Sequence, residues 1–393
     1  MRIVADQRIP FVDLAFGQFG YLVKLDSRAI DNSAVKNADA VIVRSETEVD
    51  EKLLLGSKVS FVGTATIGTD HVDLDLLKRH GIAFASAPGS NANAVAEYVF
   101  TALFTIAKRN GFALRGKVLG VVGVGNTGSK VVRIAERLGM NVLQNDPPLA
   151  RRQMVAGNHC FLSLDDLMQA DFITLHVPLT RSGLDPTLHL FDEKRLSAMK
   201  SGSLVINTSR GGVVETIALK KALTRGTIGG SVLDVWENEP NIDVDILSLS
   251  SIATPHIAGY SIDGKVNATK MIYQAFCEHF GLPQTWDAST AISESEHAVI
   301  SVDGNPHDAE EVVAQVVKQC YEIESDDKSL RKIVSLTPAE RGTHFKKLRS
   351  DYCFRHEFSN TTIVLSAQNK SLSDMFASFG FKIRYSKDID RSL

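Results

Sequence analysis

Residues Gly120–Gly128 read GVVGVGNTG, and this stretch decides the predicted fold. Gly123, Gly125 and Gly128 fill the pattern G-x-G-x-x-G, directly after an apolar run and before a segment with helical periodicity. In that setting the first glycine permits a tight turn, the second lets a pyrophosphate approach the backbone, and the third allows close contact between helix and strand. The N-terminus of the following helix offers free N–H groups to a phosphate. The stretch therefore predicts a dinucleotide-binding domain.

An acidic residue follows the glycine loop at a suitable distance. Asp146 lies 18 residues after Gly128, at the end of the apolar run MNVLQN. An acid at this place binds the ribose hydroxyls and repels a 2′-phosphate, which favours NAD over NADP. One alternative is that Asp146 only begins the turn DPP. Arg151 and Arg152 also lie close by and weaken the preference for NAD.

Short apolar runs alternate with helical patterns along much of the chain, which is typical of parallel sheets covered by helices. Strands are expected at 39–44, 58–65 and 82–87, and again in the runs VLGVVG, MNVLQN, DFITLHV, SLVINT and GSVLDV. Long helices are expected at 91–109 and 262–280, and they would lead the chain out of its first domain and back. We therefore predict an α/β protein with two doubly wound, Rossmann-like domains and a C-terminal α+β domain.

The domain boundaries follow from these patterns. We expect residues 1–90 and 258–285 to form a substrate-binding domain and residues 91–257 to form the NAD-binding domain. The small polar stretch 287–296, DASTAISESE, is typical of a linker. Residues 286–393 would then form a third domain, which has mixed helix and strand signals and no recognisable catalytic motif.

The composition narrows the class of protein. A chain of 393 residues with 44% hydrophobic and 23% charged residues should contain more than one core. A net charge of −3 gives no argument for nucleic acid or a membrane surface as partner. No apolar run approaches the roughly 20 residues that span a bilayer, and the N-terminus lacks a signal-peptide core, so we expect a cytoplasmic protein.

The cysteines give no sign of a metal site. Cys160, Cys277, Cys320 and Cys353 lie far apart and form no C-x-x-C pair. This spacing argues against a zinc site and against a disulfide framework. We expect reduced, mostly buried thiols and no bound metal.

Three residues near the ends of predicted strands form a candidate catalytic set. Arg210 lies in NTSRGG, Glu239 in WENEP and His256 in TPHIAGY. Oxidation of a 2-hydroxy acid needs a cation for the carboxylate, a base for the hydroxyl proton and an acid that orients the base; Arg210, His256 and Glu239 suit these roles in turn. Each residue alone would more often be structural. Their combination behind a glycine loop predicts catalysis.

The stretch NTSRGGVVETIALKKALTRGTIGGSVLDVWENEP, followed by TPHIAGY, resembles the D-isomer-specific 2-hydroxyacid dehydrogenases. In that family the Arg, the Glu of EP and the His of PH are catalytic, which implies these roles for Arg210, Glu239 and His256. The resemblance also places Asp234, in LDV, near the nicotinamide. One departure is Glu215–Thr216, where the family usually has Asp–Glu; it lies outside the catalytic set.

Other stretches resemble one branch of this family, among them VGTATIGTDHVD, APGSNANAVAEYVF, HIAGYSIDGK and FKKLRSDYCFRHEFS. The resemblance implies NAD-dependent oxidation of 4-phospho-D-erythronate to (3R)-3-hydroxy-2-oxo-4-phosphooxybutanoate, an early step of pyridoxal 5′-phosphate synthesis. It also implies a homodimer formed through the C-terminal domain. The expected cofactor-binding residues are Gly123, Gly125, Asn126, Thr127, Gly128, Asp146, Val177, Thr208, Ser209, Asp234 and Gly259. The expected substrate-binding residues are Ser45, Thr66 and Tyr260.

A phosphorylated substrate needs a cation at its far end. Arg44 is one candidate, and the cluster Lys346, Lys347 and Arg349 is another, which a dimer could bring to the other subunit. The cluster could equally be a solvated helix face. Two further functions stay open at this point: a D-2-hydroxyacid dehydrogenase acting on glycerate, lactate or phosphoglycerate, and a non-catalytic NAD-sensing module.

Overall fold

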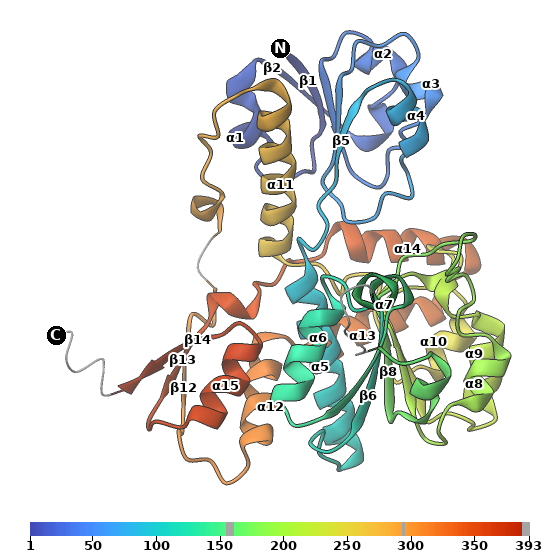
Figure 1. Ribbon diagram of the computed structural model, residues 1–393, viewed down its shortest axis with the longest axis vertical. Coiled ribbons are helices and arrows are strands. Elements are labelled where there is room, and N and C mark those ends of the chain that lie inside the picture. Colours follow the sequence, from blue (N-terminus) through green and yellow to red (C-terminus); the bar gives the residue numbers. More distant parts are fainter. Residues whose placement is uncertain (155–160, 293–294, 387–393) are drawn as a thin grey trace. The chain divides into compact units, whose positions relative to one another are not determined.

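The computed structural model describes residues 1–154, 161–292 and 295–386. The chain divides into two compact units, one comprising Met1–Asn91 and Tyr260–Glu294 and the other Ala92–Gly259 and Ser295–Leu393. Each unit contains parallel sheet covered by helices (Figure 1). The predicted α/β class is therefore confirmed.

The first unit is built on a five-stranded parallel sheet of order β2-β1-β3-β4-β5. The strands are β1 (Arg2–Asp6), β2 (Tyr21–Leu25), β3 (Ala40–Val43), β4 (Phe61–Thr64) and β5 (Ala83–Ala85). The helices are α1 (Val12–Phe16), α2 (Asn32–Val35), α3 (Glu51–Leu54), α4 (Leu74–Arg79) and α11 (Ile262–Phe280). Helix α11 packs closely on β4, because a Cβ on Gly63 would lie 2.4 Å from Ile272 Cγ2. Helix α11, although it comes late in the chain, thus completes the core of the first unit.

The second unit contains a six-stranded parallel sheet of order β11-β10-β9-β8-β6-β7. Its strands are β6 (Val118–Val122), β7 (Asn141–Asn145), β8 (Phe172–Leu175), β9 (Leu204–Asn207), β10 (Gly230–Leu233) and β11 (Ile252–Ala253). Its helices before residue 260 are α5 (Ala92–Asn110), α6 (Gly128–Arg137), α7 (Pro147–Met154), α8 (Glu193–Ala198), α9 (Thr216–Thr224) and α10 (Val244–Leu249). The strand order reverses between β6 and β8. Open α/β sheets bind their ligands at the carboxyl ends of the strands beside such a reversal.

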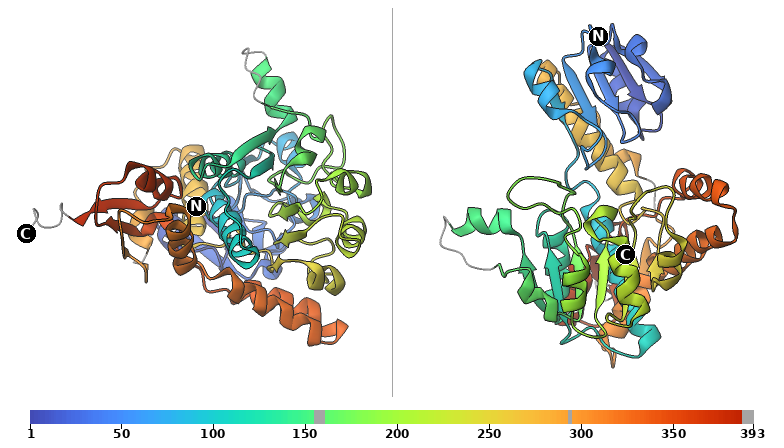
Figure 2. Two further views of the ribbon diagram at one scale, coloured as in Figure 1. Left: turned by 90° about the horizontal axis from the view of Figure 1, so that it is seen from below. Right: turned by 90° about the vertical axis from the view of Figure 1, so that its right-hand side faces the viewer.

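The C-terminal part of the second unit adds a small parallel sheet of order β12-β13-β14. Its strands are β12 (Val299–Val302), β13 (Thr362–Leu365) and β14 (Lys382–Tyr385), and its helices are α12 (Ala309–Cys320), α13 (Ile323–Arg331), α14 (Pro338–Ser350) and α15 (Lys370–Ser378). Helices α12 and α15 lie against α5 and α6 (Figure 2). Apolar side chains of α5, α6, α12 and α15 belong to one continuous core. The division into three domains at the predicted boundaries stays a prediction.

The cysteines of the described segments are free thiols. Cys277 is buried, Cys320 is half-buried and Cys353 is exposed, while Cys160 lies outside the described residues.

The carboxylate of Glu324 lies between α5, α12 and α13 and offers a test of how the C-terminal helices pack on α5. Glu324 accepts hydrogen bonds from Lys318 Nζ at 2.7 Å and Arg109 Nη2 at 2.8 Å. These bonds lower the pKa of Glu324 to about 2. A carboxyl whose pKa is lower in the folded state stabilises the fold above its unfolded-state pKa, and this stabilisation is lost as the pH falls through the folded value.

We therefore expect Glu324→Gln to lower the Tm at neutral pH by roughly 2 °C, because the pair is partly solvated. The difference from the wild type should shrink as the pH falls from about 5 towards 2. Thermal melts followed by circular dichroism across this range measure it. A difference that stays constant would contradict the assigned ion pairs.

Candidate active site

The glycine loop has the geometry of a phosphate-binding turn. Gly123 has φ +86°, and a Cβ there would lie 2.6 Å from the carbonyl oxygen of His176. A Cβ on Gly128 would lie 2.0 Å from the carbonyl oxygen of Gly123. By contrast, a Cβ on Gly125 would meet no protein atom within 4 Å. Neighbouring backbone therefore explains the two outer glycines, and the open space beside Gly125 fits the pyrophosphate of a dinucleotide.

Asp146 supports this loop from the next strand. Its Oδ2 accepts a hydrogen bond from the Val124 N–H, and its Oδ1 accepts one from the Leu149 N–H, both at 2.8 Å. The acid thus begins helix α7 and also fixes the turn that would hold the cofactor. Arg151 hydrogen-bonds to Asp185, which directs that guanidinium to a partner within the protein.

The buried carboxylate of Asp234 organises the segment that contains His256. Asp234 is 1% exposed and accepts hydrogen bonds from Thr254 Oγ1 at 2.7 Å, the Ile257 N–H at 2.7 Å and the Ala258 N–H at 3.0 Å. Burial raises the pKa of Asp234, while His256 and the three donors oppose this rise. The acceptor therefore fixes the backbone after His256 and the Thr254 side chain before it.

Glu239 and His256 form the centre of the site. His256 Nδ1 donates to Glu239 Oε2 at 2.8 Å, and the Trp236 N–H donates to Glu239 Oε1 at 2.9 Å. Burial alone would raise the pKa of Glu239, but His256, the hydrogen bonds from His256 and Trp236, and the charge of Arg349 lower it below its usual value. The carboxylate therefore stays ionised and orients the imidazole, which leaves Nε2 for a reacting group.

Arg210 lies on a loop in direct contact with the Glu239 segment. A Cβ on the next residue, Gly211, would lie 2.0 Å from the carbonyl oxygen of Trp236. Asn207, at the end of β9, donates through Nδ2 to the Arg210 carbonyl at 2.9 Å. The absence of a side chain at Gly211 thus lets the Arg210 loop approach the Trp236 backbone. All three predicted catalytic residues follow carboxyl ends of strands in one sheet.

The other expected cofactor residues of the second unit lie along the same edge. Thr208 Oγ1 lies 3.4 Å from His176 Nδ1, and Ser209 Oγ donates to Asn207 Oδ1 at 2.8 Å. Val177 directly follows His176, and its side chain packs close to Gly123. Asn126 and Thr127 immediately precede α6, and Gly259 closes the His256 segment. Their contacts with a cofactor stay predictions.

Several residues of this site had no signal in the sequence. Burial lowers the pKa of His176 to about 3, so its ring is neutral at physiological pH. Tyr98, from α5, hydrogen-bonds with Thr254 at 2.6 Å, and Trp236 Nε1 donates to the Thr254 carbonyl at 2.9 Å. Only tertiary contacts bring these side chains to the catalytic segments. Of these residues, only Trp236 belongs to a motif, WENEP, that could have drawn attention to it.

The first unit contains the three expected substrate-binding residues. Ser45 is exposed after β3, and Thr66 follows the neighbouring strand β4, so both lie at carboxyl ends of paired strands. Thr66 Oγ1 hydrogen-bonds with Thr64 Oγ1 at 2.7 Å. The Lys265 ammonium lies 4.8 Å from the centre of the Tyr260 ring. Arg44 forms an ion pair with Glu46 at 3.5 Å.

The second cationic candidate lies on α14. Lys346 and Lys347 are exposed, whereas Arg349 is half-buried and lowers the pKa of Glu239. Of this cluster, Arg349 therefore acts on the predicted catalytic set within the same chain.

Two further features of the chain concern groups that could bind a metal ion and helices that could span a membrane. Within the described ranges, no group of three or more His, Cys, Asp or Glu side chains has a geometry that could hold a metal ion. No helix of the described segments is long and apolar enough to cross a membrane.

Comparison with known proteins defines the class first. The family model of the D-isomer specific 2-hydroxyacid dehydrogenase NAD-binding domain matches residues 89–258. A second model, DUF3410, described only as a domain of unknown function, matches residues 292–380. A D-lactate dehydrogenase from Aquifex aeolicus, solved with NAD and lactic acid, is 28% identical with a TM-score of 0.60; the match covers 72% of this chain and 96% of that one. The chain thus contains the NAD-binding domain of these dehydrogenases.

Curated relatives give a narrower assignment. The erythronate-4-phosphate dehydrogenase of Salinibacter ruber is 46% identical over 92% of this chain and 94% of its own length. That of Marinobacter nauticus is 41% identical over 98% of this chain and 100% of its own length. The chain belongs to the erythronate-4-phosphate dehydrogenase family.

Cofactor preference can be tested at Asp146. We expect Asp146→Asn to raise the ratio of kcat/KM with NADP to that with NAD on the order of tenfold, because it removes a charge that repels a 2′-phosphate. Initial rates with both cofactors measure this ratio, and circular dichroism checks the fold of the variant. An unchanged ratio would leave Asp146 with the loop-supporting role alone.

Proposed function

We propose that this protein oxidises 4-phospho-D-erythronate with NAD to (3R)-3-hydroxy-2-oxo-4-phosphooxybutanoate, in the cytoplasm, as an early step of pyridoxal 5′-phosphate synthesis. The observation that carries this proposal is the His256–Glu239 pair, joined at 2.8 Å at the carboxyl edge of an NAD-binding sheet. Relatives named erythronate-4-phosphate dehydrogenase match along almost the whole chain and support the choice of substrate.

The residues divide the chemistry among them. The Arg210 guanidinium binds the substrate carboxylate and the C2 oxygen, for which its planar fork of donors is suited. His256 Nε2 accepts the C2 hydroxyl proton while the hydride leaves C2, since Nδ1 is engaged by Glu239. Glu239 stabilises the resulting imidazolium. Bound NAD supplies the nicotinamide C4 that accepts the hydride.

We infer that Ser45, Thr66 and Tyr260 bind substrate oxygens through their hydroxyls. We assign the substrate phosphate to Arg44, because it precedes Ser45 in the chain and belongs to the same unit as these three residues. Its ion pair with Glu46 spans 3.5 Å and is partly exposed, so a phosphate can compete for the guanidinium.

We further propose the domain boundaries expected from the sequence, with 1–90 and 258–285 binding substrate, 91–257 binding NAD and 286–393 forming a homodimer. Strand β12 is an outer strand of the small sheet, and an outer strand presents backbone N–H and C=O groups that can pair with another chain. Light scattering should give twice the 42.8 kDa mass of the chain. A mass of one chain at micromolar concentration would contradict the dimer.

The substrate assignment is tested by NADH formation. We expect 4-phospho-D-erythronate to be oxidised in preference to D-glycerate and 3-phospho-D-glycerate. In a parallel series an added 2-oxo acid reoxidises the NADH, and turnover is followed there by consumption of the 2-oxo acid. His256→Ala should lower kcat by about 10²- to 10⁴-fold through loss of the base. Preference for glycerate or phosphoglycerate would show that one of those acids is the substrate instead. No turnover with any of them would favour an NAD-sensing module.

The phosphate site is tested with two variants. We expect Arg44→Ala to raise the KM for 4-phospho-D-erythronate at least roughly tenfold, as loss of a charge-assisted contact should. The KM for NAD should stay the same. If Arg349→Ala instead produced this selective rise, the phosphate would belong to the α14 cluster.

A further inference from the structure

Helix α13 contacts the strand that leads to His256. Asp327, which is 6% exposed, accepts a hydrogen bond from the Ala253 N–H at 2.8 Å. Ala253 ends the outer strand β11 of the six-stranded sheet, where the next residue, Thr254, bonds to β10 through its own N–H. Without the Asp327 carboxylate, the buried N–H of Ala253 would lose its acceptor. Asp327 therefore fixes the backbone three residues before His256.

The same helix also fixes the preceding turn. Arg331 donates from Nε to Asp327 at 2.8 Å, from Nη1 to the Leu247 carbonyl at 3.0 Å and from Nη2 to the Ser250 carbonyl at 2.8 Å. These carbonyls lie at the C-terminus of α10, where helix oxygens lack partners within the helix. The Asp327–Arg331 pair thus satisfies both the end of α10 and the outer edge of β11.

Helix α14 contacts the segment that follows Glu239. A Cβ on Gly342 would lie 2.4 Å from Asn241 Oδ1, so the helix and this segment are in close contact. Phe345 is fully buried in the same apolar cluster as Trp236, whose N–H donates to Glu239. Two successive C-terminal helices therefore lie against the two segments that contain Glu239 and His256.

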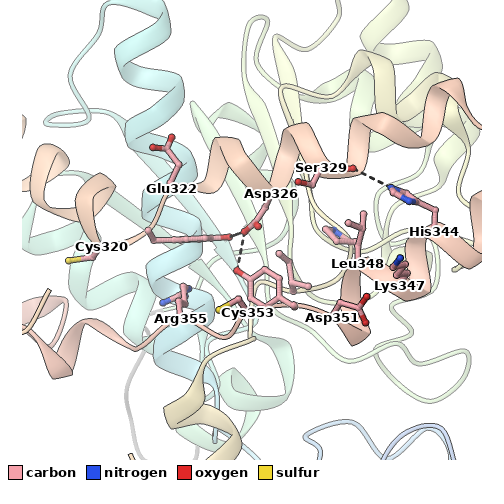
Figure 3. Close-up of a pocket in the computed structure, with 14 residues that line it drawn as sticks. Cys320, Glu322, Asp326, Ser329, His344, Lys347, Leu348, Asp351, Cys353 and Arg355 are labelled. Atoms are coloured by element: carbon pink, nitrogen blue, oxygen red, sulfur yellow. Dashed lines mark hydrogen bonds between the residues drawn. The ribbon is translucent and has the colours of Figure 1, made fainter. Parts of the chain in front are cut away.

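A cavity of about 490 Å³ lies beside the segment that contains His256. It is lined on one side by Pro255 and Ile257, which flank His256, and elsewhere by residues of α13, α14 and their connections. Figure 3 shows Asp326, Ser329 and His344 among these side chains. Hydrogen bonds to Asp327 and Asp234 hold the two ends of the segment that lines this cavity.

We propose that α13 and α14 are positioning elements of the catalytic site in their own chain, with Asp327 as the positioning residue for His256. This inference rests on the proposed function, and it gives a positioning role to a segment whose family model is described only as a domain of unknown function. A displacement of about 1 Å at a reacting group costs on the order of 100-fold in rate. Loss of a contact three residues from the base therefore reduces kcat and leaves NAD binding intact.

The test compares Asp327→Ala with a matched variant, Glu310→Ala. Glu310, on α12, accepts hydrogen bonds from the Leu114 and Arg115 N–H groups at 2.6 and 3.0 Å. These residues precede β6, at the end of the sheet opposite the catalytic residues. Both variants remove a carboxylate that joins the C-terminal part to backbone N–H groups of the NAD-binding domain. Only Asp327→Ala does so beside the catalytic segment.

We expect Asp327→Ala to lower kcat with 4-phospho-D-erythronate about 10- to 100-fold, with the NADH dissociation constant unchanged. Asp327→Asn, which keeps an oxygen acceptor for Ala253, should recover most of that loss. Glu310→Ala should lower the Tm and leave kcat within about twofold of the wild type. Equal losses of kcat in Asp327→Ala and Glu310→Ala, or a wild-type kcat in Asp327→Ala, would overturn the proposal.

A measurement independent of turnover separates this inference from the proposed function. If the wild-type protein oxidised none of the acids, the proposed function would be refuted, but the positioning role of Asp327 would not. The ¹H–¹³C NMR signal of His256, assigned with His256→Ala, should still shift in Asp327→Ala and remain in place in Glu310→Ala. A His256 signal that is unchanged in Asp327→Ala would refute the positioning role.

Discussion

The geometry of the catalytic segments depends on the buried carboxylate of Asp234. It accepts hydrogen bonds from the Thr254 hydroxyl and from the backbone N–H groups of Ile257 and Ala258, so residues on both sides of His256 share one fixed acceptor. His256 itself has φ +60°, a left-handed conformation that costs a non-glycine residue on the order of 1–3 kcal/mol. The surrounding hydrogen bonds offset this strain. The imidazole is thereby directed to Glu239 before any substrate binds, which is the preorganisation that proton transfer requires.

Close contacts also connect neighbouring loops along the carboxyl edge of the sheet. Gly211 lets the Arg210 loop meet Trp236, and Trp236 in turn donates to both Glu239 and the Thr254 carbonyl. The catalytic segments after β9, β10 and β11 are thus joined by contacts among their own residues. Helices α13 and α14 support the outer side of the same segments. A fold known mainly for its nucleotide-binding sheet here has its reactive edge supported by the C-terminal part of the chain.

Much of this arrangement could be predicted from the sequence, for identifiable reasons. The glycine loop and the expected strands at 39–44, 58–65 and 82–87 depend on local patterns, and the structure has strands within all three ranges. No strand is expected at β1 or β2, which the structure adds, and the C-terminal part has only mixed helix and strand signals. The role of Asp327 could not be predicted, because a single acid on a helix does not reveal which distant N–H it meets.

The central claim is that a hydride moves from C2 of the hydroxy acid to NAD while His256 takes the hydroxyl proton. Turnover of 4-phospho-D-erythronate deuterated at C2 tests this directly, with the NADH isolated and its mass measured. Our account predicts NADH that contains one deuterium, and a rate slower than with the unlabelled acid where hydride transfer limits turnover. Unlabelled NADH, with the deuterium released to water, would contradict it.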